Sequence, residues 1–78
     1  RADMAFNNTI KSLRLSCLMN QAEFGEAIGV SFTTVNRWEN GKSKPNITAM
    51  KAIKDFCLKR DIEFDKIEQS WLGLHVEE

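Results

Sequence analysis

Cysteine, proline, glycine and tyrosine are scarce in this chain, and it contains no long hydrophobic run. Its 78 residues include two cysteines, one proline, four glycines and no tyrosine. No apolar run approaches the roughly 20 residues that a membrane-spanning helix needs. The first four residues also lack the apolar stretch of a secretory signal peptide. We therefore expect a cytoplasmic protein without a membrane partner, and Met4 is a candidate native start that leaves residues 1–3 as an addition.

The two cysteines, Cys17 and Cys57, lie forty positions apart, without a Cys-x-x-Cys pair or a cluster of histidines. This spacing is typical of neither a zinc site nor a disulfide framework. Both cysteines are surrounded by apolar residues, where a free thiol usually acts as a small core side chain. We expect structural thiols, with no metal and no cofactor.

The length and the distribution of polar residues also argue against an enzyme. A chain of this length has no room for a separate substrate lobe, at about 100–200 residues per domain. Glu23 and Glu26 are spaced like a carboxylate pair, but no nucleophile, base and orienting partner assemble around them. The single histidine, His75, lies in an acidic terminal stretch. We therefore expect no enzymatic activity.

Charge is divided unevenly along a chain whose net charge is zero. Residues 1–32 are neutral, whereas residues 33–60 carry seven basic and two acidic side chains. Residues 61–78 carry one basic and six acidic side chains. Binding to a polyanion requires local positive charge, because cations must displace the counterions condensed on the phosphates. The middle segment can supply that charge, and a solvated helical surface is the alternative interpretation.

Apolar residues recur at helical spacing through the chain, and no sustained strand pattern is present. The apolar faces of the first, second and fourth expected helices are, in order, Ile10, Leu13, Cys17 and Leu18; Phe24, Ala27 and Ile28; and Ile47, Met50, Ile53 and Cys57. The residues expected to cap the first four helices are Asn8 or Thr9, Asn20 with Glu23, Ser31, and Asn46. A fifth helix is expected over about residues 65–74. Five short helices predict an all-α bundle.

The most informative stretch is Gln21–Gly41. It contains two short helices joined by Gly29-Val30-Ser31, a three-residue turn with a glycine, which is the pattern of a helix-turn-helix. Gly25 is small where the two helices must approach closely, and Gly29 supplies the backbone freedom that the sharp turn needs. We therefore divide the chain into a tail at 1–7, a helix-turn-helix domain at 8–60 and an acidic, helical extension at 61–78.

A helical wheel of the second helix of this motif, about residues 32–40, separates a packing face from a polar face at about 100° per residue. The residues predicted to contact DNA bases are Phe32, Thr33, Asn36 and Arg37. Arg37 can pair with guanine O6 and N7, Asn36 with adenine N6 and N7, and Phe32 or the methyl of Thr33 with a thymine methyl. An alternative for Phe32 is packing on the turn at the rim of the helix.

The motif resembles the Cro and repressor proteins of phages and bacteria, the XRE-type helix-turn-helix family. The segments that carry the resemblance, between about Ile10 and Leu58, are Asn20-Gln21-Ala22-Glu23-Phe24, Gly29-Val30-Ser31 and Arg37-Trp38-Glu39-Asn40-Gly41-Lys42-Ser43-Lys44-Pro45. The resemblance implies a five-helix, lambda-repressor-like domain that binds double-stranded DNA with a recognition helix in the major groove.

The family pattern also implies roles for individual residues. The residues expected to hold phosphates are Gln21, Ser31, Asn40, Lys42 and Lys44. Arg14 and Glu39 match a buried structural ion pair of the family. The chain departs from the family at Phe32 and Thr33, where the phage repressors often carry glutamine, so their operator sequences do not transfer.

The acidic extension contains an apolar stripe at helical spacing, formed by Phe64, Ile67, Trp71 and Leu74. The stripe either folds back over the small core or forms an interface with a second copy or another protein. Its negative charge is repelled by DNA, so we expect it to lie away from the duplex.

The sequence therefore predicts a sequence-specific DNA-binding protein, most simply a dimeric transcriptional regulator that associates with the nucleoid. One alternative is the DNA-targeting domain of a larger DNA-modifying protein. Another is an antitoxin-like or adaptor module that binds a protein partner through residues 61–78.

Overall fold

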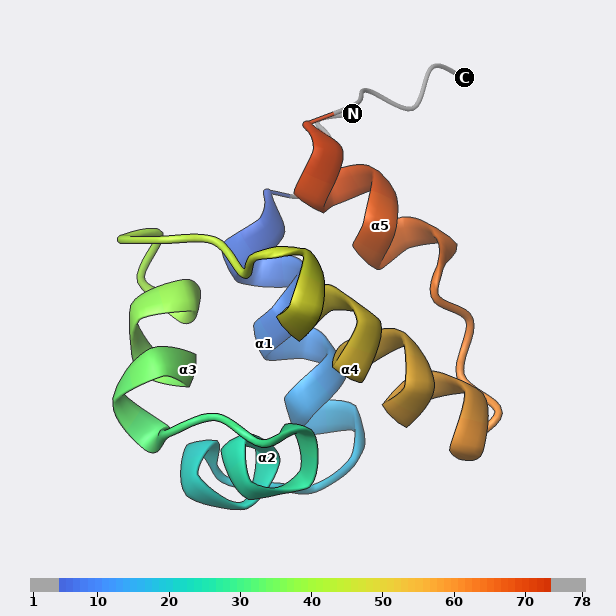
Figure 1. Ribbon diagram of the computed structural model, residues 1–78, viewed down its shortest axis with the longest axis horizontal. Coiled ribbons are helices and arrows are strands. Elements are labelled where there is room, and N and C mark those ends of the chain that lie inside the picture. Colours follow the sequence, from blue (N-terminus) through green and yellow to red (C-terminus); the bar gives the residue numbers. More distant parts are fainter. Residues whose placement is uncertain (1–4, 74–78) are drawn as a thin grey trace.

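Five helices make up the part of the computed structural model that is described, residues 5–73 (Figure 1). They are α1 (Phe6–Ser16), α2 (Gln21–Ile28), α3 (Phe32–Glu39), α4 (Ile47–Lys59) and α5 (Asp65–Leu72). Over residues 5–73 the chain forms no strand, and the prediction of an all-α fold is confirmed. None of these helices is both long and apolar enough to cross a membrane.

The first helix begins earlier than its sequence predicts. α1 starts at Phe6 after Ala5, which offers no side-chain cap, so the expected start at Asn8 or Thr9 is wrong. The hydroxyl of Thr9 instead donates to the carbonyl oxygen of Ala5 at 3.1 Å. The Phe6 side chain is buried in the core. Its burial stabilises the additional turn, so the domain includes residues that we expected in the tail.

Three of the predicted caps are confirmed. The Asn20 side chain accepts from Glu23 N at 2.8 Å, and the Glu23 carboxylate accepts from Asn20 N at 2.9 Å, which completes a capping box. Ser31 accepts from the N–H of Thr34, and Asn46 accepts from the N–H of Ala49. α2 ends as predicted at Gly29, which has a φ of +83° in the left-handed region.

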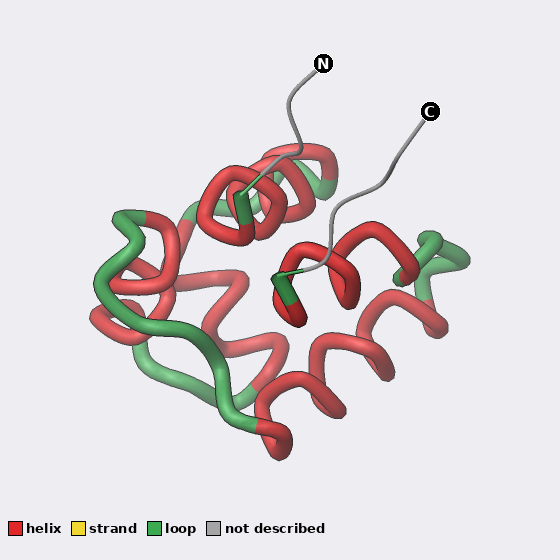
Figure 2. The backbone as a smooth tube through the Cα atoms, turned by 90° about the horizontal axis from the view of Figure 1, so that it is seen from above, coloured by secondary structure: helices red, strands yellow, loops and turns green. Residues whose placement is uncertain are grey.

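The described helices pack around a hydrophobic core. Figure 2 shows the arrangement of these helices seen from above. The buried members of the core are Phe6, Ile10, Leu13, Phe24, Ile28, Val35, Trp38, Met50, Ile53, Phe56, Cys57 and Ile67. Three residues expected on the apolar faces are exposed: Leu18, Ala27 and Ile47. Leu18 follows the end of α1 in a left-handed turn, with a φ of +59°, so helical spacing no longer places it on the helix face.

α5 packs against this core. Ile67 is buried, and Phe64 and Trp71 pack against the core. The indole Nε1 of Trp71 donates to the carbonyl oxygen of Pro45 at 2.7 Å, which fastens α5 to the loop before α4. The helix ends at Leu72, two residues before the expected end, because Gly73 takes a left-handed conformation. The fourth member of the stripe, Leu74, lies outside the described residues.

Candidate nucleic-acid interface

α2 makes a very close backbone contact with the turn that leads into α3. A Cβ atom added at Gly25 would lie 2.6 Å from the carbonyl oxygen of Val30, so only glycine fits. The N–H of Val30 donates to the carbonyl oxygen of Gly25 at 2.8 Å across the same contact. Backbone atoms of α2 and of the turn are therefore packed closely together, and this packing sets how the chain enters α3.

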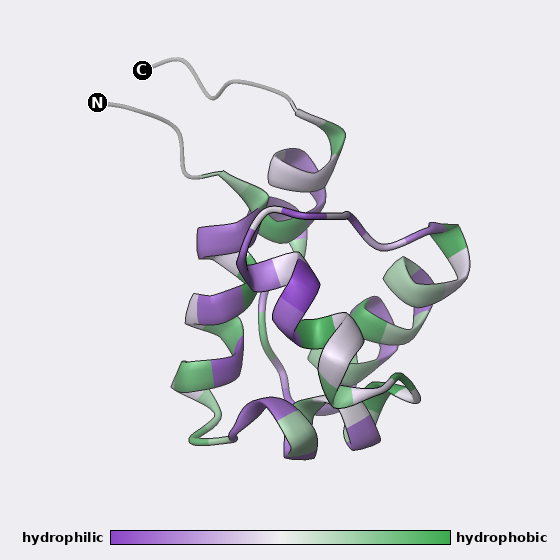
Figure 3. Ribbon diagram, turned by 90° about the vertical axis from the view of Figure 1, so that its left-hand side faces the viewer, coloured by the Kyte–Doolittle hydropathy of each residue, from purple (hydrophilic) through white to green (hydrophobic). Residues whose placement is uncertain are grey.

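α3 has the two faces that the helical wheel predicts. Val35 and Trp38 are buried in the core, and Phe32, Thr33 and Arg37 are exposed. Figure 3 views the molecule from the side of α3 and shows hydrophilic residues (purple) along part of this helix. The exposed face combines a guanidinium, a hydroxyl with a methyl group, and an aromatic ring, which are groups that read base edges in the major groove.

An ion pair lies directly behind this face. Arg14 Nε lies 2.6 Å from Glu39 Oε2, and Arg14 Nη2 donates to Glu39 Oε1 at 2.9 Å. Arg14 Nη1 also donates to the carbonyl oxygen of Met19 at 2.9 Å. Burial raises the pKa of the Glu39 carboxyl, but hydrogen bonds from Arg14 and Gln21 and the charges of Arg14 and Lys11 outweigh it. The pKa of Glu39 therefore lies below its ordinary value, and this pair ties α1 to the end of α3.

A chain of amide side chains runs from the ion pair toward the outer face of α3. Gln21 Nε2 donates to Glu39 Oε1 at 2.9 Å, and Asn36 Nδ2 donates to Gln21 Oε1 at 3.2 Å. Asn40 Nδ2 donates to the side-chain and backbone oxygens of Asn36, at 3.1 and 3.0 Å. Of these links, only the one between Asn36 and Asn40, four residues apart, has a signal in the sequence. The links to Gln21 depend on how α2 crosses α3 and cannot be predicted from spacing.

The residues expected to bind phosphates have different surroundings. Gln21 is the first residue of α2, where a backbone N–H has no partner within the helix. The Ser31 hydroxyl caps α3, and Lys42 is exposed. Lys44 Nζ donates to the carbonyl oxygen of Trp71 at 3.1 Å, at the C-terminal end of α5. Arg37 and Lys44 both line a hollow beside α3, where they place two positive charges.

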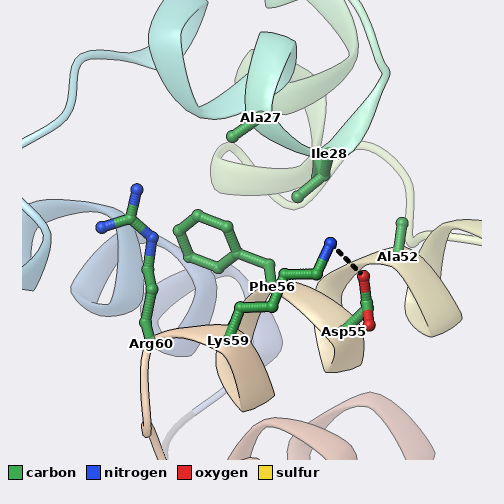
Figure 4. A pocket seen from close by; sticks show the side chains of 7 residues that line it. All are labelled: Ala27, Ile28, Ala52, Asp55, Phe56, Lys59 and Arg60. Atoms are coloured by element: carbon green, nitrogen blue, oxygen red, sulfur yellow. Dashed lines mark ion pairs between the residues drawn. The ribbon is translucent and has the colours of Figure 1, made fainter.

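Another hollow lies between α2 and α4, and none of its lining residues belongs to α3 (Figure 4). Its charged groups interact with their neighbours. Lys59 Nζ lies 3.1 Å from Asp55 Oδ2, and the Arg60 guanidinium carbon lies 4.6 Å from the centre of the Phe56 ring. These contacts stabilise the end of α4.

Both cysteines have free thiols. Burial, together with the nearby Cys17, raises the pKa of the Cys57 thiol to about 11. Because this pKa lies far above neutrality, the Cys57 thiol is protonated at neutral pH. A protonated thiol is neither a nucleophile nor a metal ligand, so Cys57 acts as a core side chain.

Comparison with known proteins places this geometry in a family. A family model described as helix-turn-helix matches residues 10–57, more than half of the chain. The chain is similar to the HTH-type transcriptional activator BcrR of Enterococcus faecalis, at 36% identity over 53 residues, which are 68% of this chain and 26% of that protein. It is also similar to the Type II methyltransferase M.SsoII of Shigella sonnei, at 43% identity over 51 residues, which are 62% of this chain and 14% of that protein. No solved structure matches the chain with significance.

The chain thus spans well under a third of the length of either relative. The matched region contains the whole of α2, the turn and α3, together with most of α1 and α4. The chain belongs to the XRE-type helix-turn-helix family of DNA-binding domains.

Proposed function

We propose that this domain reads a specific sequence in double-stranded DNA and regulates transcription. The observation that carries the proposal is α3, whose exposed face presents Phe32, Thr33 and Arg37 on a helix fixed by the Gly25 contact. In this proposal Lys42, which is exposed, and the N-terminal end of α2 hold phosphates, which set the register of a protein on the duplex. Similarity to a transcriptional activator supports the regulatory role.

Selection from a random duplex library, with binding then measured against salt concentration, tests this function. We expect one enriched motif and an affinity that falls with salt, because the phosphate contacts release counterions. Binding that is equally weak for every sequence would contradict specific reading. Absence of binding at low salt would contradict DNA binding by this chain.

A second candidate function is the targeting of a larger DNA-modifying protein, and similarity to a methyltransferase favours it. In this reading the chain has no enzymatic activity of its own. The selected motif, placed upstream of a reporter gene in bacterial cells that express the chain, separates the two functions. A change in reporter expression supports a regulator, and an unchanged reporter on an occupied motif supports a targeting domain.

We further propose that two copies bind a palindromic site in the cytoplasm, on the nucleoid. Half-sites one helical turn apart, at about 34 Å, would match the symmetry of a dimer. A hollow between α4 and α5 supports this assembly. Its apolar lining residues are Ile47, Met50, Phe64 and Trp71, and the charged Lys51, Lys54 and Glu68 complete it. Ile67 of the apolar stripe is buried within the chain, so a second copy would contact the residues that line this hollow and not Ile67.

A further inference from the structure

The hydrogen bonds that link Glu39, Gln21, Asn36 and Asn40 all run in one direction from donor to acceptor. The Glu39 carboxylate can only accept hydrogen bonds when it is ionised, so Gln21 must turn its NH₂ group toward it. The Gln21 oxygen then faces Asn36 and accepts a hydrogen bond from the NH₂ group of Asn36. The Asn36 oxygen is left to accept from Asn40. Each amide is therefore oriented by the one before it.

Asn40, the last amide in this series of hydrogen bonds, imposes the same direction. The Asn40 NH₂ group also donates to the backbone carbonyl oxygen of Asn36, which is an acceptor that cannot reverse. A reversed Asn36 amide would place its NH₂ group against that of Asn40 and its oxygen against that of Gln21. Two hydrogen bonds would then be replaced by two repulsive contacts.

The fixed direction determines what Asn36 can offer to a base. Its NH₂ group has two N–H donors, of which one is used by Gln21, and its oxygen has two lone pairs, of which one is used by Asn40. One donor and one acceptor remain on an amide that is only half-buried. A donor beside an acceptor is the complement of adenine, which presents N7 and the N6 amino group in the major groove.

We propose that Glu39 is a positioning residue for DNA reading: acting through Gln21, it fixes the orientation of the Asn36 amide, and Asn36 in that orientation reads adenine. The inference rests on the proposed function, since it requires α3 to lie in the major groove. It distinguishes Asn36 from Arg37, whose exposed guanidinium needs no such support.

The donor-to-acceptor direction of these amide hydrogen bonds can be tested in the protein without DNA. In protein labelled with ¹³C and ¹⁵N, scalar couplings across hydrogen bonds should connect Gln21 Nε2 with the Glu39 carboxyl carbon, and Asn36 Nδ2 with the Gln21 carboxamide carbon. Both couplings should disappear in Gln21→Met, which keeps the length of the side chain and leaves the Arg14–Glu39 pair intact. A wild-type protein without these couplings would overturn the proposal.

The reading of adenine is tested by library selection with the variants Asn36→Ala, Gln21→Met and Glu39→Gln. Asn36→Ala identifies the base pair that Asn36 reads, where we expect the preference for adenine to fall by about fivefold to a hundredfold. Gln21→Met and Glu39→Gln should weaken the preference at that same base pair, and Gln21→Met should add nothing to Asn36→Ala. Arg37→Ala is the matched control and should relax a different base pair.

These measurements separate positioning from a structural or phosphate-binding role. Loss of a phosphate contact at Gln21 lowers affinity for all sequences alike, whereas loss of positioning changes one base pair. An unchanged adenine preference in Gln21→Met overturns the positioning role. This test holds even if the Glu39→Gln variant does not fold, because it does not depend on that variant. A wild-type chain that selects no motif removes the proposed function and the adenine reading together.

Discussion

The Glu39 carboxylate accepts hydrogen bonds from two side chains of different helices, Arg14 on α1 and Gln21 on α2. Moving both charges of the ion pair out of water costs free energy. Their mutual attraction offsets this cost only when the geometry of the pair is good. Here the guanidinium binds the carboxylate through two N–H groups, which is the geometry that repays it best. Removal of either partner leaves an uncompensated charge behind the recognition helix.

The lowered pKa of Glu39 predicts a loss of stability in acid. Glu39 is ionised more readily in the folded than in the unfolded chain, so it stabilises the fold at pH values above its ordinary pKa of 4.5. That contribution is lost as pH falls through the lower pKa of the folded state. In urea unfolding between pH 7 and pH 3, the difference in stability between wild type and Glu39→Gln should be constant near neutrality and shrink in acid. Parallel curves down to pH 3 would contradict this assignment.

Arg37 on α3 and Lys42 in the loop after it are both exposed cations, but we expect their removal to have different consequences. Arg37→Ala should cost about 1–3 kcal/mol on the selected site and relax the base preference there. Lys42→Ala should weaken binding to all sequences alike and reduce the salt slope by about one unit. Binding of both variants to the selected site and to random duplexes, at several salt concentrations, measures the difference. Identical behaviour of the two would show that the roles are assigned wrongly.

At the scale of the helices, the close packing of α2 against the turn before α3 depends on Gly25. Gly25→Ala places a Cβ against the backbone oxygen of Val30, which cannot rotate away as a side chain would. We expect a loss of about 3 kcal/mol, the upper part of the usual range for overpacking. Thermal or urea unfolding measures it.

Gly29→Asn is the matched control for Gly25→Ala. Gly29 has nothing within 4 Å of an added Cβ, and its φ of +83° is one that asparagine tolerates. The cost there should stay below about 1 kcal/mol. A loss at Gly25→Ala as small as that at Gly29→Asn would contradict the close contact as the limit at Gly25, because Gly25 lies within α2 and does not have a positive φ.

The limits of sequence-based prediction follow from how local each feature is. The caps at Asn20, Ser31 and Asn46 involve residues three positions apart, so spacing alone predicts them. The early start of α1 depends on burial of Phe6 by distant parts of the chain, which spacing cannot show. The link from Asn36 to Gln21 depends equally on tertiary packing, because it joins two helices at an angle set by the turn.

At the scale of the whole molecule, α5 provides core cover that a short chain otherwise lacks. A domain of this size buries only about 60–65% of the surface that its unfolded chain exposes. Ile67 and the hydrogen bond from Trp71 to Pro45 join α5 to the other helices. Phe64, Ile67 and Trp71 of the apolar stripe lie in or against the core, so their burial determines where this acidic helix packs.

The proposed dimer can be separated from the stability of the monomer at Ile47. This residue is 64% exposed at the start of α4 and lines the apolar hollow beside α5, whereas Leu58 is 68% exposed near the end of the same helix and does not line it. Because both are exposed, Ile47→Glu and Leu58→Glu should each change the free energy of unfolding by no more than about 0.5 kcal/mol.

Only Ile47→Glu should shift the chain from dimer to monomer in sedimentation velocity and weaken binding to a palindrome more than binding to a single half-site. A charge placed in a dimer interface must be desolvated without a partner, which disfavours association. If both variants sediment like wild type and keep its preference for the palindrome, the two copies meet through another surface. If wild type is a monomer on and off DNA, the paired half-sites are contradicted as well.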